Sequence, residues 1–149
     1  MLLSNNNIIN KLSRFLIVLL FVYAGCSKVL AHTLFVNQLS QIIFLKNIAV
    51  VVSIALPILE ILTGFLIAGN QTQIYGWWLA YILMTIFTVY VAMMLLSKNS
   101  LPCTCGGVIA SMTWKQHLIF NIFFMFLLWF MLLNYSEEKN KIISTNKRK

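Results

Sequence analysis

The sequence predicts an all-α integral membrane protein, a four-helix bundle with a short interfacial amphipathic helix after the first span. The chain has 149 residues, of which 60% are hydrophobic and 9% are charged. So few charges could not cover that much apolar surface in a soluble globular protein. The apolar residues form four runs, each near the length that a helix needs to cross a bilayer. The basic residues gather at the ends of these runs, so the net charge of +8 indicates a lipid bilayer as partner and no nucleic acid.

A single membrane domain is expected over residues 12–135. The polar, asparagine-rich residues 1–11 are expected to form a disordered tail, and the charged residues 136–149 a solvated, basic cytoplasmic tail. The spans are predicted at about residues 12–31, 48–68, 74–96 and 115–135.

The first span contains a lysine near its outer end. Gly25, Lys28 and His32 fall on one face of the predicted helix. We expect the Lys28 ammonium to reach the membrane interface by snorkelling, and the alternative is that it faces the bundle interior. The stretch that ends at Cys26 shares features with a lipoprotein signal, but Tyr23 stands where that signal favours leucine. We therefore expect the segment to be retained as a helix.

Residues 32–47 predict an amphipathic helix that lies in the interface. The apolar residues at helical spacing are Phe35, Leu39, Ile42 and Ile43. The polar residues of the other face are Asn37, Gln38 and Gln41.

The second span carries one acidic residue, Glu60, near mid-membrane. It belongs to a stripe at helical spacing made of Ser53, Pro57, Glu60 and Gly64. A carboxylate there costs several kcal/mol unless it is protonated or paired, so the stripe should face the interior. Three roles stay open for Glu60: a neutral hydrogen-bonding group, a proton-relay or cofactor-binding group, and the partner of Lys28. A difference in depth of roughly 18 Å, from about 12 residues at 1.5 Å each, counts against that pair.

The last two spans offer packing residues and one buried amide. A short turn at residues 69–73 makes the second and third spans antiparallel neighbours. Trp77 and Trp78 begin the third span, where interfacial anchors usually stand. A stripe suited to helix packing follows: Tyr81, Thr85, Thr88 and Ala92. In the fourth span we expect Asn121 to bond across helices, with cofactor contact as the alternative.

Reactive chemistry is concentrated between the third and fourth spans, where Cys103 and Cys105 stand one residue apart, after Pro102 and before Gly106 and Gly107. A Cys-x-Cys disulfide closes a small, strained ring that is easily reduced, as catalytic disulfides are. The pair could take electrons from a partner's thiols through a mixed disulfide. It would then pass them to an acceptor, for which the bilayer offers a quinone.

Cys103 and Cys105 are therefore the candidate catalytic residues. The candidate relay or supporting residues are Cys26, Lys28, Glu60, Trp114, His117 and Asn121. Cys26 could relay if it comes within about 6 Å of the pair, Cα to Cα. Nearby positive charge from Lys98, Lys115 or protonated His117 would favour a thiolate. No metal site is predicted, because the second half of a zinc site is missing, although a soft metal held with His117 or His32 stays an alternative, as does a purely structural pair.

The distribution of basic residues predicts the orientation. Four spans place both termini on one side. The segments on that side carry seven basic residues: Lys11, Arg14, Lys139, Lys141, Lys147, Arg148 and Lys149. The segments on the other side carry four: Lys28, Lys46, Lys98 and Lys115. This favours cytoplasmic termini in a bacterial inner membrane, with Cys103 and Cys105 facing the oxidising compartment.

The four-span pattern with Leu101-Pro102-Cys103-Thr104-Cys105-Gly106-Gly107 resembles the MauE family, within the broader DoxX-like group. That family carries Cys-x-Cys-Phe-Gly between its third and fourth spans, and Gly106 replaces the phenylalanine here. The Ala24–Lys28 and Leu59–Gly64 segments also look DoxX-like, and the resemblance covers roughly residues 10–135. It implies a membrane protein of methylamine utilisation that supports disulfide formation in an exported partner. The layout is similar to quinone-linked thiol oxidoreductases such as vitamin K epoxide reductase, whose Cys-x-x-Cys is absent from this sequence.

Two functions follow as hypotheses. The first is a membrane thiol–disulfide oxidoreductase that oxidises exported or periplasmic thiol proteins through Cys103 and Cys105, with a quinone as acceptor. The second is a non-catalytic membrane subunit or chaperone of an exported redox enzyme, in which the pair binds metal or serves as a structural clip.

Overall fold

The computed structural model describes residues 2–42, 45–96 and 113–146, with side chains from residue 8 to residue 135 apart from residue 114. Within these ranges every regular element is a helix. The elements in chain order are α1 (Leu2–Leu30), α2 (His32–Gln41), the 3-10 turn η1 (Lys46–Ile48), α3 (Ala49–Ala68), α4 (Gln73–Leu96) and α5 (Trp114–Asn146).

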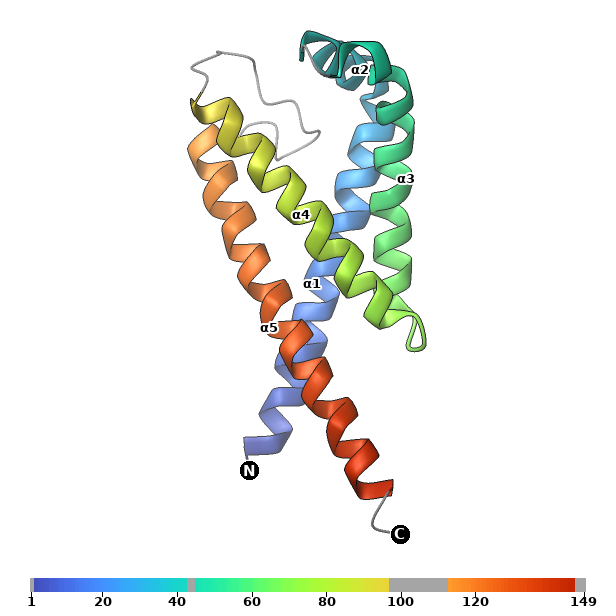
Figure 1. Ribbon diagram of the computed structural model, residues 1–149, viewed down its shortest axis with the longest axis vertical. Coiled ribbons are helices and arrows are strands. Elements are labelled where there is room, and N and C mark those ends of the chain that lie inside the picture. Colours follow the sequence, from blue (N-terminus) through green and yellow to red (C-terminus); the bar gives the residue numbers. More distant parts are fainter. Residues whose placement is uncertain (1, 43–44, 97–112, 147–149) are drawn as a thin grey trace.

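Four helical segments of the described chain are long and apolar enough to cross a membrane. They are Ile8–Leu30, Lys46–Ala68, Gln73–Leu96 and Lys115–Tyr135. They form two closely packed pairs, α1 with α3 and α4 with α5, and the beginning of α4 joins the pairs by packing on α3 (Figure 1). Both termini lie at one end of the bundle, and α2 lies across the other end. The predicted all-α membrane bundle is confirmed.

The first and last helices, α1 and α5, are longer than expected from the sequence. α1 already begins at Leu2, and α5 continues to Asn146. The backbone is therefore helical over most of both predicted tails. Extending a helix that a membrane span has already nucleated fixes one residue per hydrogen bond gained, so polar residues can continue it at little cost.

The short helix α2 is amphipathic, as predicted, although it ends at Gln41 and not at residue 47. Its buried residues Phe35 and Leu39 pack on Ala49 at the start of α3. Its polar face is turned outward, with Asn37 and Gln41 exposed. α2 therefore covers the first turns of α3, which extend beyond the end of α1 (Figure 1).

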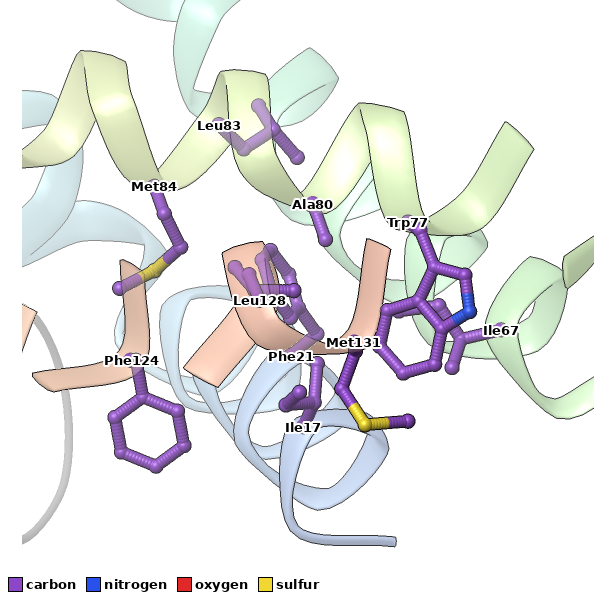
Figure 2. Close-up of a cluster of buried hydrophobic side chains, with 10 residues drawn as sticks. All are labelled: Ile17, Phe21, Ile67, Trp77, Ala80, Leu83, Met84, Phe124, Leu128 and Met131. Carbon is purple, nitrogen blue, oxygen red and sulfur yellow. The ribbon is translucent and has the colours of Figure 1, made fainter. Parts of the chain in front are cut away.

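The apolar core lies where α3, α4 and α5 meet α1. Its fully or nearly fully buried members are Ile17, Phe21, Ile67, Trp77, Ala80, Leu83, Met84, Phe124, Leu128 and Met131 (Figure 2). Trp77 is 0% exposed and Trp78 is 54% exposed. The prediction that both tryptophans are interfacial anchors is therefore wrong for Trp77. The reason is the close contact one residue earlier, where a Cβ on Gly76 would lie 2.6 Å from the Ile67 backbone nitrogen.

The predicted packing stripe of α4 is confirmed at two positions that contact α5. The rings of Tyr81 and Trp129 lie 6.2 Å apart, centroid to centroid. The Thr88 hydroxyl donates to the Met84 carbonyl at 2.7 Å and lies 3.3 Å from the Met125 sulfur. These contacts hold α4 and α5 together as one wall of the bundle.

Arg14 caps the C-terminal end of α3 by donating hydrogen bonds to its last carbonyls. Its Nε donates to the Ile67 carbonyl at 2.9 Å, and its Nη2 donates to the Ala68 carbonyl at 2.6 Å and to Asn70 Oδ1 at 3.2 Å. The last carbonyls of a helix have no partner within the helix, and a cation there also offsets the negative end of the helix dipole.

We expect Arg14→Gln to lower the free energy of unfolding by about 1–3 kcal/mol, because hydrogen bonds from a charged donor are lost, one of them at the part-buried Ile67 carbonyl. Arg14→Lys should recover little, since an ammonium cannot reproduce the guanidinium fork. Chemical unfolding in mixed micelles measures both. The control is Lys11→Gln, at an exposed position one turn away. An equal loss in Arg14→Gln and Lys11→Gln would contradict the capping role.

Candidate functional site

The site begins with a close approach between α1 and α3. An ideal Cβ on Gly25 would lie 2.7 Å from Ile61 Cγ1, 3.0 Å from the Pro57 carbonyl oxygen and 3.4 Å from Glu60 Cβ. Only a glycine fits at this separation without a shift of the neighbouring groups. Gly25 therefore allows the backbone of α1 to lie close to α3, at the level of Glu60.

Lys28 and Glu60 form a buried ion pair. The Lys28 Nζ lies 2.6 Å from Glu60 Oε1, and the two side chains are 6% and 1% exposed. The same Nζ donates to the Ala24 carbonyl at 3.4 Å and lies 5.3 Å from the centroid of the Phe87 ring. Lys28 thus links α1 to α3 and α4 inside the bundle. The expectation that it snorkels to the interface is wrong.

The pair forms because the two residues lie at nearly the same depth. Gly25 is level with Glu60, and Lys28 is three residues further along α1, or about 4.5 Å at 1.5 Å per residue. Side chains lean toward the N-terminus of their own helix. In antiparallel helices Lys28 and Glu60 therefore lean toward each other. The depth difference inferred from the sequence was too large, because α3 starts beyond the end of α1.

The predicted stripe of α3 is confirmed as the face toward α1. Ser53, Pro57, Glu60 and Gly64 are all buried. Ser53 Oγ donates to the Val50 carbonyl at 2.7 Å and lies 3.2 Å from Nε2 of His32, which is the first residue of α2. With Arg14 at the C-terminal end of α3, the packing around α3 thus has polar contacts at both ends and at the level of Glu60.

A cavity with an open mouth adjoins the ion pair between the α1–α3 and α4–α5 pairs. Its apolar walls come from α1, α4 and α5: Leu20, Phe21, Ala24, Met84, Phe87, Val91 and Phe120. Its polar lining residues are Lys28, Glu60, Tyr90, His117 and Asn121. Four helices thus present polar groups to one largely apolar space.

Two polar atoms of this lining have no hydrogen-bond partner among the described residues. They are Glu60 Oε2 and Asn121 Nδ2. Glu60 is 0% and Asn121 is 4% exposed. The expectation that the Asn121 amide bonds across helices is therefore wrong for its Nδ2. Buried polar atoms without a partner are rare and call for an explanation.

The structure brings together four of the residues that the sequence analysis selected: Lys28, Glu60, His117 and Asn121. Cys26 is exposed on α1 and does not line the cavity. Trp114 begins α5, and its side chain lies outside the described part of the chain.

Cys103 and Cys105 also lie outside the described residues. Their segment joins Leu96, the last residue of α4, to α5, which begins at Trp114. Both of these helix ends lie at the α2 end of the bundle (Figure 1). Two cavity residues are close to them in sequence, since Val91 is five residues before Leu96 and His117 three residues after Trp114.

Phe87 and Tyr90 are cavity residues that the sequence analysis missed. With Met84 and Val91 they form a second face of α4 at spacings of three and four residues. The polar stripe on the adjoining face was more conspicuous, because a lipid-facing and a cavity-facing apolar surface look the same in a sequence.

Comparison with known proteins supplies the family. The model of a family described as methylamine utilisation protein MauE matches residues 6–134. No curated protein and no solved structure matches the chain. The match covers the four candidate membrane segments, apart from the last residue of the fourth, and most of the 149 residues. The chain therefore belongs to the MauE family, multi-pass membrane proteins associated with methylamine utilisation.

Proposed function

We propose that the protein is a membrane thiol–disulfide oxidoreductase that oxidises exported thiol proteins through Cys103 and Cys105. The observation that carries the proposal is a largely apolar cavity with polar lining residues that extends toward the end of α4 and the start of α5, the two helix ends that the cysteine segment joins in the sequence. A redox dithiol in a membrane needs an electron acceptor and groups that handle protons. The cavity is lined by Lys28, Glu60 and His117, three side chains that can carry protons.

The exchange moves two electrons and two protons from the partner to the Cys103–Cys105 pair. A thiolate of the partner attacks one sulfur of the Cys103–Cys105 disulfide, which breaks that bond and forms a mixed disulfide. The partner's second thiolate then attacks the mixed disulfide, which releases the oxidised partner. Cys103 and Cys105 are left as a dithiol that has gained two electrons and two protons. An oxidant in the bilayer must remove them before the next cycle.

The proposed orientation has both termini in the cytoplasm of a bacterium, with the protein in the inner membrane. The structure changes the charge count that supports it. Lys28 is neutralised by Glu60 inside the bundle, so it cannot act as an external loop charge. The sequence count of seven basic residues against four becomes seven against three.

Thiol trapping in intact cells tests the proposal. We expect an impermeant alkylating reagent to label Cys103 and Cys105 only after reduction, because they rest as an outward-facing disulfide. Cys103→Ser or Cys105→Ser should lower the oxidation of exported thiols to the level of cells without the protein. The matched control, Ser100→Ala in the same segment, should keep full oxidation.

Two outcomes would count against the redox function. Full oxidation of exported thiols in either serine variant would contradict it. Labelling of both cysteines without prior reduction, together with bound copper or zinc in the purified protein, would favour a metal-binding accessory subunit.

A further inference from the structure

We propose that the cavity beside the Lys28–Glu60 pair binds the ring of a quinone dissolved in the bilayer. This inference rests on the proposed function, for which the quinone is the electron acceptor. The proposed site is built from described residues of α1, α3, α4 and α5. Quinone binding to it can be measured without turnover.

The walls fit a flat apolar ring. Phe21, Phe87 and Phe120 line the space from three different helices. The space opens at a mouth and its lining is largely apolar, as in small-molecule sites. Such sites combine largely apolar walls with a few polar groups that fix the orientation of the ligand.

The polar groups match the oxygens of a quinone. Asn121 Nδ2 is a buried donor without a partner among the described residues. The Lys28 ammonium has three N–H donors, of which the Glu60 and Ala24 oxygens take two. The Asn121 amide group and one N–H of Lys28 are therefore left for carbonyl oxygens, which accept hydrogen bonds and carry no charge.

The unpartnered Glu60 Oε2 suits the reduced form. A quinol has hydroxyl donors in place of carbonyl acceptors, and Glu60 Oε2 is an acceptor that lines the same space. In the step itself, the Cys103–Cys105 dithiol loses two electrons and two protons and forms a disulfide bond. The quinone gains two electrons and two protons and becomes the quinol.

Other bilayer components fit less well. A lipid acyl chain would fill the apolar walls but leave Asn121 Nδ2 and Glu60 Oε2 unsatisfied, which is costly in a buried site. The carboxylate of a fatty acid would meet Glu60, a like charge, while Lys28 is already paired. The site thus favours a neutral ring with oxygen acceptors.

Equilibrium dialysis of the full chain in detergent, with ubiquinone carrying a single isoprenoid unit as the probe, tests the inference. We expect saturable binding that weakens about tenfold in Asn121→Leu, the loss of one buried hydrogen bond at similar side-chain volume. Asn121→Asp should weaken it further, because a carboxylate repels a carbonyl oxygen. Ala24→Phe should abolish binding by filling the cavity.

The matched control is Asn134→Leu, the same change on the same helix. Asn134 bonds Asn10 at 3.2 Å and does not line the cavity, so binding should stay within about twofold of the unchanged protein. An absence of saturable binding would overturn the inference. So would equal weakening in Asn121→Leu and Asn134→Leu, or binding that Ala24→Phe leaves intact.

A variant that lacks the Cys103–Cys105 pair separates this inference from the proposed function. Cys103→Ser/Cys105→Ser should bind the probe with unchanged affinity, because the cavity is built from other residues. If that protein binds the quinone but the native cysteines never cycle in cells, the redox function fails and the site stands. If the cysteines cycle and no quinone binds, the site fails and the redox function stands.

Discussion

Glu60→Leu is expected to destabilise the protein by about 3–5 kcal/mol, the cost of removing one member of a buried ion pair. The variant removes the counter-charge at 2.6 Å from Lys28, a residue that is 5% exposed, and among the described residues leaves its ammonium the Ala24 carbonyl as a hydrogen-bond acceptor. A buried charge in a medium of low dielectric constant has neither water nor a counter-charge to stabilise it. Unfolding in mixed micelles, followed by circular dichroism, measures the loss.

The double variant Lys28→Met/Glu60→Leu should regain most of the lost stability, because buried ion pairs replaced by apolar residues of similar volume are often neutral or better. The control for the lysine is Lys46→Met, an exposed position where the change should stay within about 0.5 kcal/mol. If Glu60→Leu alone is as stable as the double variant, the two residues are not coupled in the protein.

Gly25→Leu is expected to cost about 3 kcal/mol, the upper end of the range for overpacking. Its Cβ would meet Ile61 Cγ1 at 2.7 Å and the Pro57 carbonyl oxygen at 3.0 Å. A side-chain carbon can rotate away, but the carbonyl belongs to the α3 backbone. The helices must therefore separate at the level of Glu60, which also stretches the ion pair. The same unfolding experiment gives the size of the effect.

Ala55→Leu is the matched control, because Ala55 is exposed on α3 and a larger side chain there should change stability by no more than about 0.5 kcal/mol. The coupling to the ion pair gives a sharper test. Gly25→Leu should cost less in the Lys28→Met/Glu60→Leu background, since no pair remains to be stretched. Equal costs in both backgrounds would show that Gly25 does not position the pair.

Periodicity and composition were sufficient to predict the four spans, the amphipathic helix and the buried face of α3. Ser53, Pro57, Glu60 and Gly64 repeat at helical spacing, and all four are buried. A polar stripe in a membrane span has few alternatives to the bundle interior, because lipid cannot satisfy it. Patterns within one helix are therefore readable from the sequence.

Contacts between helices were less predictable, because they depend on how far one helix is shifted along another. Lys28 was expected at the interface and Glu60 deep in the membrane, but the register of α1 against α3 brings them to 2.6 Å. Trp77 was expected at the interface because it stands at the start of a span. The close approach of α4 to α3 at Gly76 buries it instead. Asn121 lines a cavity, and its Nδ2 has no hydrogen-bond partner among the described residues. Periodicity within one helix does not predict a space between helices.

The Lys28–Glu60 pair also bears on how this chain can change over evolutionary time. A substitution at either position alone passes through a protein with a buried, unmatched charge, and selection acts on that intermediate before a second substitution can repair it. Loss of both charges together removes the obstacle, yet it requires two changes in one lineage. Glu60 and Lys28 are 32 residues apart in the sequence, yet we expect them to be kept or lost together.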